Sequence, residues 1–348
     1  MIDSSRIHDA QSLLARHFGP TRIARAASLS SSGHDVFLKI ETELPTGSFK
    51  VRGAIYALSV NVARGTVEPC PAKAQRATAG EVVCASTGNH GAAVAYAARL
   101  LGVPATIFLP DSPNPVKAAR IRALGARIVE VGADLSAAID AAQDYAERAP
   151  AFFLHDASDP DVPAGTATIG LEIVAQLPEV DVIFVPMGDT ALIRGVASAA
   201  KQHRSSIRIV GVVAEQAPAY LLSWQESRRI GTTDVAQAFR PAGGADLEVH
   251  ATSSGADGVV ETATCDTIAD GLAIRRPLAP NVAAIRELVD EVVAVSEREM
   301  LDAIEWLEIR EQVIAEPAGA AAPAGLLRHE RLGATSVALV TGCNARPR

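Results

Sequence analysis

Short apolar runs alternate with longer alanine-rich segments over most of the chain. Each run has the length of a buried strand, and the segments between them have helical length. The runs that we expect to form strands lie at 36–40, 82–85, 105–109, 127–131, 152–154, 182–185, 207–213 and 337–340. This alternation indicates β-α-β units, in which helices cover both faces of a mainly parallel sheet. The pattern therefore predicts an α/β protein.

Residues at the ends of the predicted helices support this assignment. The segments expected to be helical include 49–58, 92–101, 115–124, 135–148 and 192–203. Asp134 can accept hydrogen bonds at the start of one helix, and Gly125 can end another. Two stretches break the rhythm: 61–80 is predicted to be an exposed excursion, and 216–260 to be irregular and to border the functional site.

Composition narrows the class of protein. A chain of 348 residues with 48% hydrophobic residues suggests two lobes with full cores. The net charge of −8 and the isoelectric point near 5.5 argue against nucleic acid or an anionic membrane as partner. Scattered cysteines without a Cys-x-x-Cys pair fit a reducing compartment, and no signal or membrane-spanning run is visible. We expect a soluble, cytoplasmic protein.

Candidate chemistry begins at Lys50. It lies in the string LPTGSFKVRGA, after a turn containing Pro45 and Gly47, and in the first turn of a predicted helix. The positive field at a helix N-terminus favours the neutral form of a lysine amine. A neutral amine is the form that makes a Schiff base with a carbonyl compound.

Further motifs follow in a characteristic order, each at the junction of a predicted strand and helix or at a strand end. They are Ser86-Thr87-Gly88-Asn89-His90, Gly165-Thr166-Ala167-Thr168, Gly188-Asp189-Thr190-Ala191-Leu192 and Thr341-Gly342-Cys343-Asn344. With the Lys50 string, these motifs resemble the fold-type II pyridoxal-phosphate-dependent enzymes of the tryptophan synthase β-like superfamily. The similarity is to the threonine/serine dehydratase and serine racemase branch, and it covers about residues 39–344.

The resemblance implies roles for the residues around the cofactor, pyridoxal 5′-phosphate. Lys50 would bind it covalently and then remove the substrate Cα proton, and Asn89 would hydrogen-bond the 3′ oxygen of the ring. Phe49 would pack beside the ring, although an ordinary core aromatic is an equal interpretation. Thr341 would face the pyridine nitrogen. A neutral partner leaves that nitrogen largely unprotonated, which favours β-elimination or β-replacement over transamination.

The loop from Ser86 to His90 is implied to hold the substrate carboxylate through Ser86, Thr87, Gly88, Asn89 and His90. Free N–H groups at a helix N-terminus attract anions. The alternative is a polar turn that only caps the next helix, in which case His90 satisfies the helix start. Thr87 stands where racemases of the family carry serine and threonine dehydratases carry alanine, so its hydroxyl leaves racemisation open.

The segment Gly188, Asp189, Thr190, Ala191 and Leu192 occupies the place of the family's glycine-rich phosphate loop. A carboxylate ~6 Å from a phosphate costs about 3 kcal/mol at an effective dielectric of about 20. We therefore expect Asp189 to turn away, to cap the helix that starts at Thr190, and to pair with Arg194. The Thr190 hydroxyl is expected to donate to the phosphate.

No metal site is expected. Many relatives bind a divalent cation near residues 211–220, but the corresponding positions here are Val213 and Ala219, with Glu215 leaving the register open. Glu316 belongs to another family signature, which we expect to open a helix and to have a structural role.

The predicted organisation is a smaller lobe at 79–157 inserted into a larger pyridoxal-phosphate-binding lobe formed by 1–78 and 158–348. The predicted function is an ammonia-lyase that eliminates the β-hydroxyl of a small hydroxy-amino acid, assisted by the cofactor phosphate. The alternatives are a β-replacement synthase of the cysteine or diaminopropionate type, an amino-acid racemase, and a cofactor-binding protein with little catalysis. We expect a homodimer.

Overall fold

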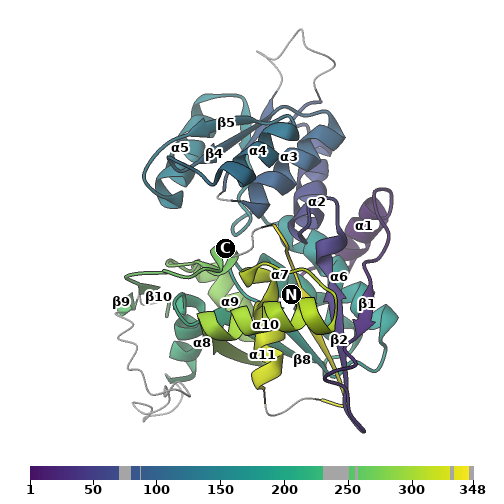
Figure 1. The fold of residues 1–348 in the computed structure, drawn as a ribbon. Helices are drawn as coiled ribbons and strands as arrows, with labels where there is room; N and C mark the ends of the chain where they lie inside the picture. The colour runs from purple at the N-terminus through teal and green to yellow at the C-terminus, as the bar shows by residue number, and fades with distance from the viewer. Residues whose placement is uncertain (70–79, 87, 230–250, 255–257, 330–332, 345–348) are drawn as a thin grey trace.

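Two parallel sheets dominate the fold of the computed structural model (Figure 1). It describes residues 1–69, 80–86, 88–229, 251–254, 258–329 and 333–344. The larger sheet has the strand order β1-β2-β12-β7-β8-β11: Ile23–Arg25, Asp35–Ile40, Thr335–Val340, Val182–Pro186, Arg208–Ala214 and Glu291–Val295. Only β1 runs antiparallel to its neighbour in this sheet. The predicted mainly parallel α/β architecture is confirmed.

The second sheet is parallel throughout and lies in the upper body of Figure 1. Its order is β5-β4-β3-β6: Arg127–Glu130, Ala105–Leu109, Glu81–Ala85 and Ala151–Phe153. All four strands come from one continuous part of the chain, whereas the larger sheet uses strands from before and after it. A small antiparallel pair, β9 (Ala251–Ser254) and β10 (Val260–Thr262), completes the described strands.

Helices pack around both sheets (Figure 1). They are α1 Ser4–Leu14, α2 Lys50–Ala63, α3 Asn89–Leu101, α4 Pro115–Ala123, α5 Leu135–Arg148, α6 Val162–Gln176, α7 Ala191–His203, α8 Ala219–Arg229, α9 Ala279–Leu288, α10 Glu297–Arg310 and α11 Pro317–Arg328, with 3-10 turns η1 Glu41–Glu43 and η2 Asp270–Leu272. Asp134 caps α5 by accepting from the Ala137 N–H, and Gly125 follows α4 with φ +91°, both as predicted. None of the described helices combines the length and apolar character needed to cross a membrane.

The predicted elements match the structure closely, with a few exceptions. Strands β1, β9, β10 and β11 were not anticipated. Strand β1 is very short, β11 follows a helix without a turn signal, and β9 and β10 lie in or at the end of the stretch expected to be irregular. The stretch 216–260 was expected to be irregular, yet it begins with α8. Residues 70–79 of the expected excursion, and 230–250 of the expected irregular stretch, lie outside the described part of the chain.

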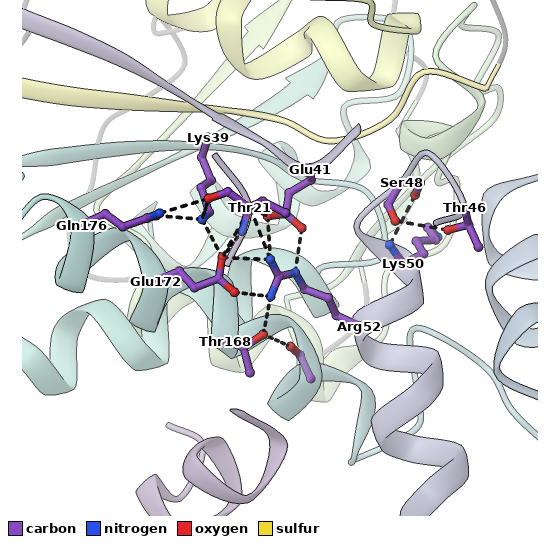
Figure 2. A network of polar contacts seen from close by, with 11 residues as sticks. Thr21, Lys39, Glu41, Thr46, Ser48, Lys50, Arg52, Thr168, Glu172 and Gln176 are labelled. Carbon is purple, nitrogen blue, oxygen red and sulfur yellow. Dashed lines mark hydrogen bonds and ion pairs between the residues drawn. The ribbon is translucent and has the colours of Figure 1, made fainter. Parts of the chain in front are cut away.

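A buried network of charges fixes α2 against the larger sheet (Figure 2). The Arg52 guanidinium donates to Glu41 of η1 at 2.7 Å and to Glu172 of α6 at 2.6 Å. Lys39 of β2 also donates to Glu172, at 2.6 Å, and all four side chains are buried. These bonds join β2, α2 and α6, so they fix the position of the helix that begins with Lys50.

Candidate active site

A pocket opens where the N-termini of α2, α7 and α11 converge near the end of β12. Most of the residues predicted to bind the cofactor or substrate line it: Phe49, Lys50, Asn89, His90, Gly188, Asp189, Thr190, Ala191, Leu192 and Thr341. An adjoining pocket shares Lys50, Asn89 and His90 and adds Ser86 and Gly88. Thr87 lies outside the described residues. The chain therefore brings together every described residue of the predicted site.

Lys50 is the first residue of α2, and its ammonium group contacts the carboxylate of Asp156. Burial lowers the pKa of Lys50, but the charges of Asp156, Asp189 and Glu316 raise it, and the net shift is upward. The expectation that the helix N-terminus would favour a neutral amine is therefore wrong for the protein without cofactor. The acidic groups around the amine set the direction of its pKa shift.

Asp156 was missed by sequence reasoning. It follows β6 and lies in both pockets, with a carboxylate oxygen 3.8 Å from Nδ1 of His90. Burial would raise its pKa, but Lys50, His90 and His155 together hold the pKa below the usual range. The carboxyl ends of parallel strands are where α/β proteins place ligands, so its position after a predicted strand was the available signal.

The side chain of Asp189 does not cap α7, contrary to the prediction. Thr190 is the N-cap residue, and no side chain makes a capping hydrogen bond there. The Asp189 carboxyl instead reaches the carboxyl of Asp156, close to the positive charge of Lys50. Burial and the charge of Asp156 raise the pKa of Asp189 to about 7. Arg194 donates to the carbonyl of Ala157 at 3.1 Å rather than pairing with Asp189.

The start of α7 has the features of a phosphate cradle. The Thr190 hydroxyl is buried in the pocket wall and lacks a hydrogen-bond partner among the described residues. Gly188 has no room for a side chain, because a Cβ atom would lie 2.2 Å from the Gly271 carbonyl oxygen. Free N–H groups at the start of a helix of this length attract anions. An unsatisfied hydroxyl beside them fits a bound phosphate group.

Asn89 of α3 connects to the start of α11 and to Asn344 across the pocket. Its side-chain amide donates to Glu316 at the start of α11, and its carbonyl oxygen accepts from Asn344 at 2.6 Å. The Asn344 N–H donates to Glu316 at 3.1 Å. Glu316 opens a helix as expected, but it also lines the pocket, so the purely structural role is too narrow.

The loop before α3 is held by local hydrogen bonds. The Gly88 N–H donates to the Ser86 hydroxyl at 3.0 Å. His90 contacts the carbonyl of Leu154 through Nε2 at 3.0 Å, and because a carbonyl only accepts, Nε2 carries the proton. Burial lowers the pKa of His90, which keeps the ring neutral. Contact of these residues with a substrate carboxylate stays a prediction.

A second ion pair lies in the lining of the adjoining pocket and was also missed. Lys117 of α4 contacts the carboxylate of Asp270 in η2, and both residues line the adjoining pocket.

Thr341 lies directly after β12 and lines the same pocket as Lys50. Its hydroxyl donates to the Ala318 carbonyl at 3.4 Å.

Comparison with known proteins decides the family. The family model described as "Pyridoxal-phosphate dependent enzyme" matches residues 14–342. This chain belongs to that family. Its cofactor is pyridoxal phosphate, and the pocket fits this group. Lys50, whose amine can form the covalent link, lines the pocket, and the unpartnered Thr190 hydroxyl lies in the wall of the same pocket.

Relatives place the chain within the family. It is 33% identical to an L-threonine ammonia-lyase of Geobacter sulfurreducens, over 99% of this chain and 76% of that protein. Two solved structures are each 27% identical: a T.th. threonine deaminase, with a TM-score of 0.80 over all of both chains, and maize serine racemase, with a TM-score of 0.77 over 99% of this chain and 95% of that one. In the described part of the chain, no group of three or more His, Cys, Asp or Glu residues could hold a metal ion.

Proposed function

We propose that this pyridoxal-phosphate enzyme is an ammonia-lyase acting on a small hydroxy-amino acid such as threonine or serine. It eliminates the β-hydroxyl group and releases a 2-oxo acid and ammonia. The observation that carries the proposal is the meeting of Lys50, Asn89, Thr190 and Thr341 in one pocket. The similarity to L-threonine ammonia-lyases over nearly the whole chain supports it.

The cofactor, when bound, withdraws electrons from the substrate Cα. Residues of the chain hold the cofactor and the substrate. The Thr190 hydroxyl and the first N–H groups of α7 hold the phosphate, and the neutral Thr341 hydroxyl lies in the same pocket wall. The loop of Ser86 and Gly88 at the start of α3 holds the substrate carboxylate.

Lys50 moves the proton. The substrate amine displaces Lys50 from its covalent link and leaves its Nζ atom free. That atom then acts as a general base and accepts the Cα proton. The surrounding carboxylates stabilise the ammonium group formed. Loss of the β-hydroxyl then leaves the electron pair in a carbon–carbon double bond, and hydrolysis of the product gives the 2-oxo acid.

Racemisation is the second candidate, because the fold also matches a structure named serine racemase and Thr87 carries a hydroxyl. A panel of amino acids with added pyridoxal phosphate tests both, together with β-replacement. Release of 2-oxo acid from L-threonine or L-serine supports the lyase. D-serine formed from L-serine faster than pyruvate, and lost in Thr87→Ala, would make the protein a racemase. Turnover that requires an added nucleophile would make it a synthase.

We further propose a homodimer in the cytoplasm, with residues 79–157 as the smaller lobe. The continuous four-stranded sheet from β3 to β6 supports those bounds. In the described part of the chain, Cys84, Cys265 and Cys343 are not in disulfides, which fits a reducing compartment. Light scattering of the purified chain tests the dimer.

A further inference from the structure

Two carboxyl groups meet beside the amine of Lys50. Asp156 contacts the ammonium group directly, and the Asp189 carboxyl lies within hydrogen-bonding reach of Asp156. They come from different parts of the chain, Asp156 from the loop after β6 and Asp189 from the turn before α7. Both line the pocket that holds Lys50, so a substrate attached there lies near them.

Besides Lys50, the guanidinium group of Arg194 carries a positive charge near this pair. The groups that interact electrostatically with Asp156 are Lys50 of α2, His90 of α3, His155 of its own loop and Cys84 of β3. The groups that interact electrostatically with Asp189 are Lys50, Arg194 of α7 and Tyr220 of α8. Glu316 of α11 adds a further negative charge near Lys50. His90 is neutral. Arg194 donates to the Ala157 carbonyl and its charge lowers the pKa of Asp189, but burial and the charge of Asp156 outweigh it.

Two carboxylates in contact cannot both ionise easily, so a pair of this kind retains one proton. The raised pKa of Asp189 and the lowered pKa of Asp156 agree with this arrangement. When Lys50 is joined to the cofactor, the pair loses its full ammonium partner. A proton held close to neutral pH is well suited to general acid catalysis.

We propose that Asp156 and Asp189 share one proton and that Asp156 carries a proton between Lys50 and the departing β-hydroxyl group. This inference rests on the proposed lyase function. The Cα–H bond breaks and its proton passes to Lys50 Nζ, then to Asp156. Asp156 gives a proton to the β-oxygen as the C–O bond breaks, so the oxygen leaves as water with the bonding pair. The electrons from the C–H bond form the new double bond, and no oxidant or further proton is needed.

A spectroscopic titration tests the pair without relying on activity. Visible absorbance of the holoenzyme is followed against pH in wild type, Asp156→Asn, Asp189→Asn and the exposed-site control Asp140→Asn on α5. Removing the Asp156 charge should move the midpoint of the cofactor–lysine band at least about one pH unit lower, because an adjacent anion stabilises the protonated link. Asp189→Asn should remove an inflection near neutral pH. Profiles of both variants that overlay the control would overturn the pair.

Proton exchange tests the transfer itself. The hydroxy-amino acid that the wild type eliminates is incubated in D₂O, and deuterium at Cα of recovered substrate is compared with 2-oxo acid release. In Asp156→Asn, elimination should fall at least about 100-fold, the range of general acid catalysis, while Cα exchange continues. The ratio of exchange to elimination should therefore rise by at least about 100-fold.

An unchanged ratio in Asp156→Asn would overturn the proposal. It would arise if Asp156 only positions Lys50, so that both rates fall together, or if another group protonates the hydroxyl, so that neither falls. The proposed function fails separately, if wild type releases no 2-oxo acid from any hydroxy-amino acid. The absorbance titration still decides whether the carboxyl pair exists in that case.

Discussion

Helix α2 carries two cations with opposite surroundings, the buried Arg52 and the partly buried Lys50. Around Arg52, two positive groups (Arg52 and Lys39) meet two carboxylates (Glu41 and Glu172), and each is hydrogen-bonded (Figure 2). Around Lys50, a single ammonium group lies among Asp156, Asp189 and Glu316, whose charges all raise its pKa. The first cluster is neutral and closed. The second carries excess negative charge in an open pocket.

The difference shows how a fold can use the same chemistry for two purposes. A balanced buried network gives each charge a fixed partner, so its protonation does not change when a ligand arrives. An unbalanced cluster depends on its occupants, because one added cation or proton changes the pKa of every member. The Arg52 network therefore fixes α2 in position, and the Lys50 cluster is left able to react.

The largest expected effect is on Lys50. Lys50→Ala should abolish 2-oxo acid release and the visible absorbance of lysine-bound cofactor, because the covalent link requires this amine. Lys50→Arg is the matched variant: it keeps the positive charge among the carboxylates but makes no Schiff base. It should therefore lose activity as completely while retaining thermal stability closer to wild type. Lysine-bound absorbance persisting in Lys50→Ala would assign the link to another lysine.

Arg52 should decide stability rather than chemistry. Arg52→Met leaves Glu41 and Glu172 buried without their shared partner, which should cost about 3–5 kcal/mol in the free energy of unfolding. The surface pair Arg22–Glu43 provides the control, since both side chains are substantially exposed. Arg22→Met should cost less than about 1 kcal/mol. Denaturant unfolding of both variants measures the contrast, and equal losses would contradict it.

The protein's stability should depend on pH through Asp189, a member of the charge cluster around Lys50. The pKa of Asp189 is raised to about 7 in the folded protein, against 3.8 as the reference value. Between these pH values the folded state binds more protons than the unfolded state, so stability falls as pH rises. In the cofactor-free protein, thermal unfolding from pH 4 to 8 should show a steeper loss for wild type than for Asp189→Asn. Parallel curves would mean that Asp189 ionises normally.

The smallest expected effect concerns Thr190, whose backbone has φ +70°. This left-handed conformation costs a β-branched residue about 1 kcal/mol. Thr190→Gly should relieve that strain but remove the hydroxyl, lowering pyridoxal-phosphate affinity about fivefold, the worth of one neutral hydrogen bond. Thr190→Ser keeps the hydroxyl and should keep the affinity. Equal affinity of all three proteins in a fluorescence titration would remove the hydroxyl from the phosphate site.

Local sequence signals predicted much of this molecule. Apolar runs gave the buried strands to within one or two residues, because parallel strands covered on both faces are apolar throughout. Lys50, Asn89 and Thr341 were identified through motifs that resemble those of the family, and all three line one pocket. Asp156 belongs to none of these motifs, and its position after a predicted strand marks it only as a candidate. Its role depends on a contact with Lys50, and neither residue's neighbours in the sequence show it.

Asp189 shows that local sequence rules can also predict a contact that the fold does not form. Its position before a helix favoured a capping role by local rules. The structure places its carboxyl beside Asp156 instead, near the positive charge of Lys50. The tertiary fold thus overrides a local preference that amounts to about 1 kcal/mol.

The strand order has a consequence for how the chain folds as it is synthesised. Strand β12 lies between β2 and β7, although both precede it by a long stretch of sequence. The four-stranded sheet of β3 to β6 can form as soon as its own continuous segment has left the ribosome. The larger sheet stays divided until residues 335–340 emerge, and Thr341 follows them directly. Newly made chains therefore hold Lys50 well before they have a complete pocket, and cofactor capture becomes a late event in biosynthesis.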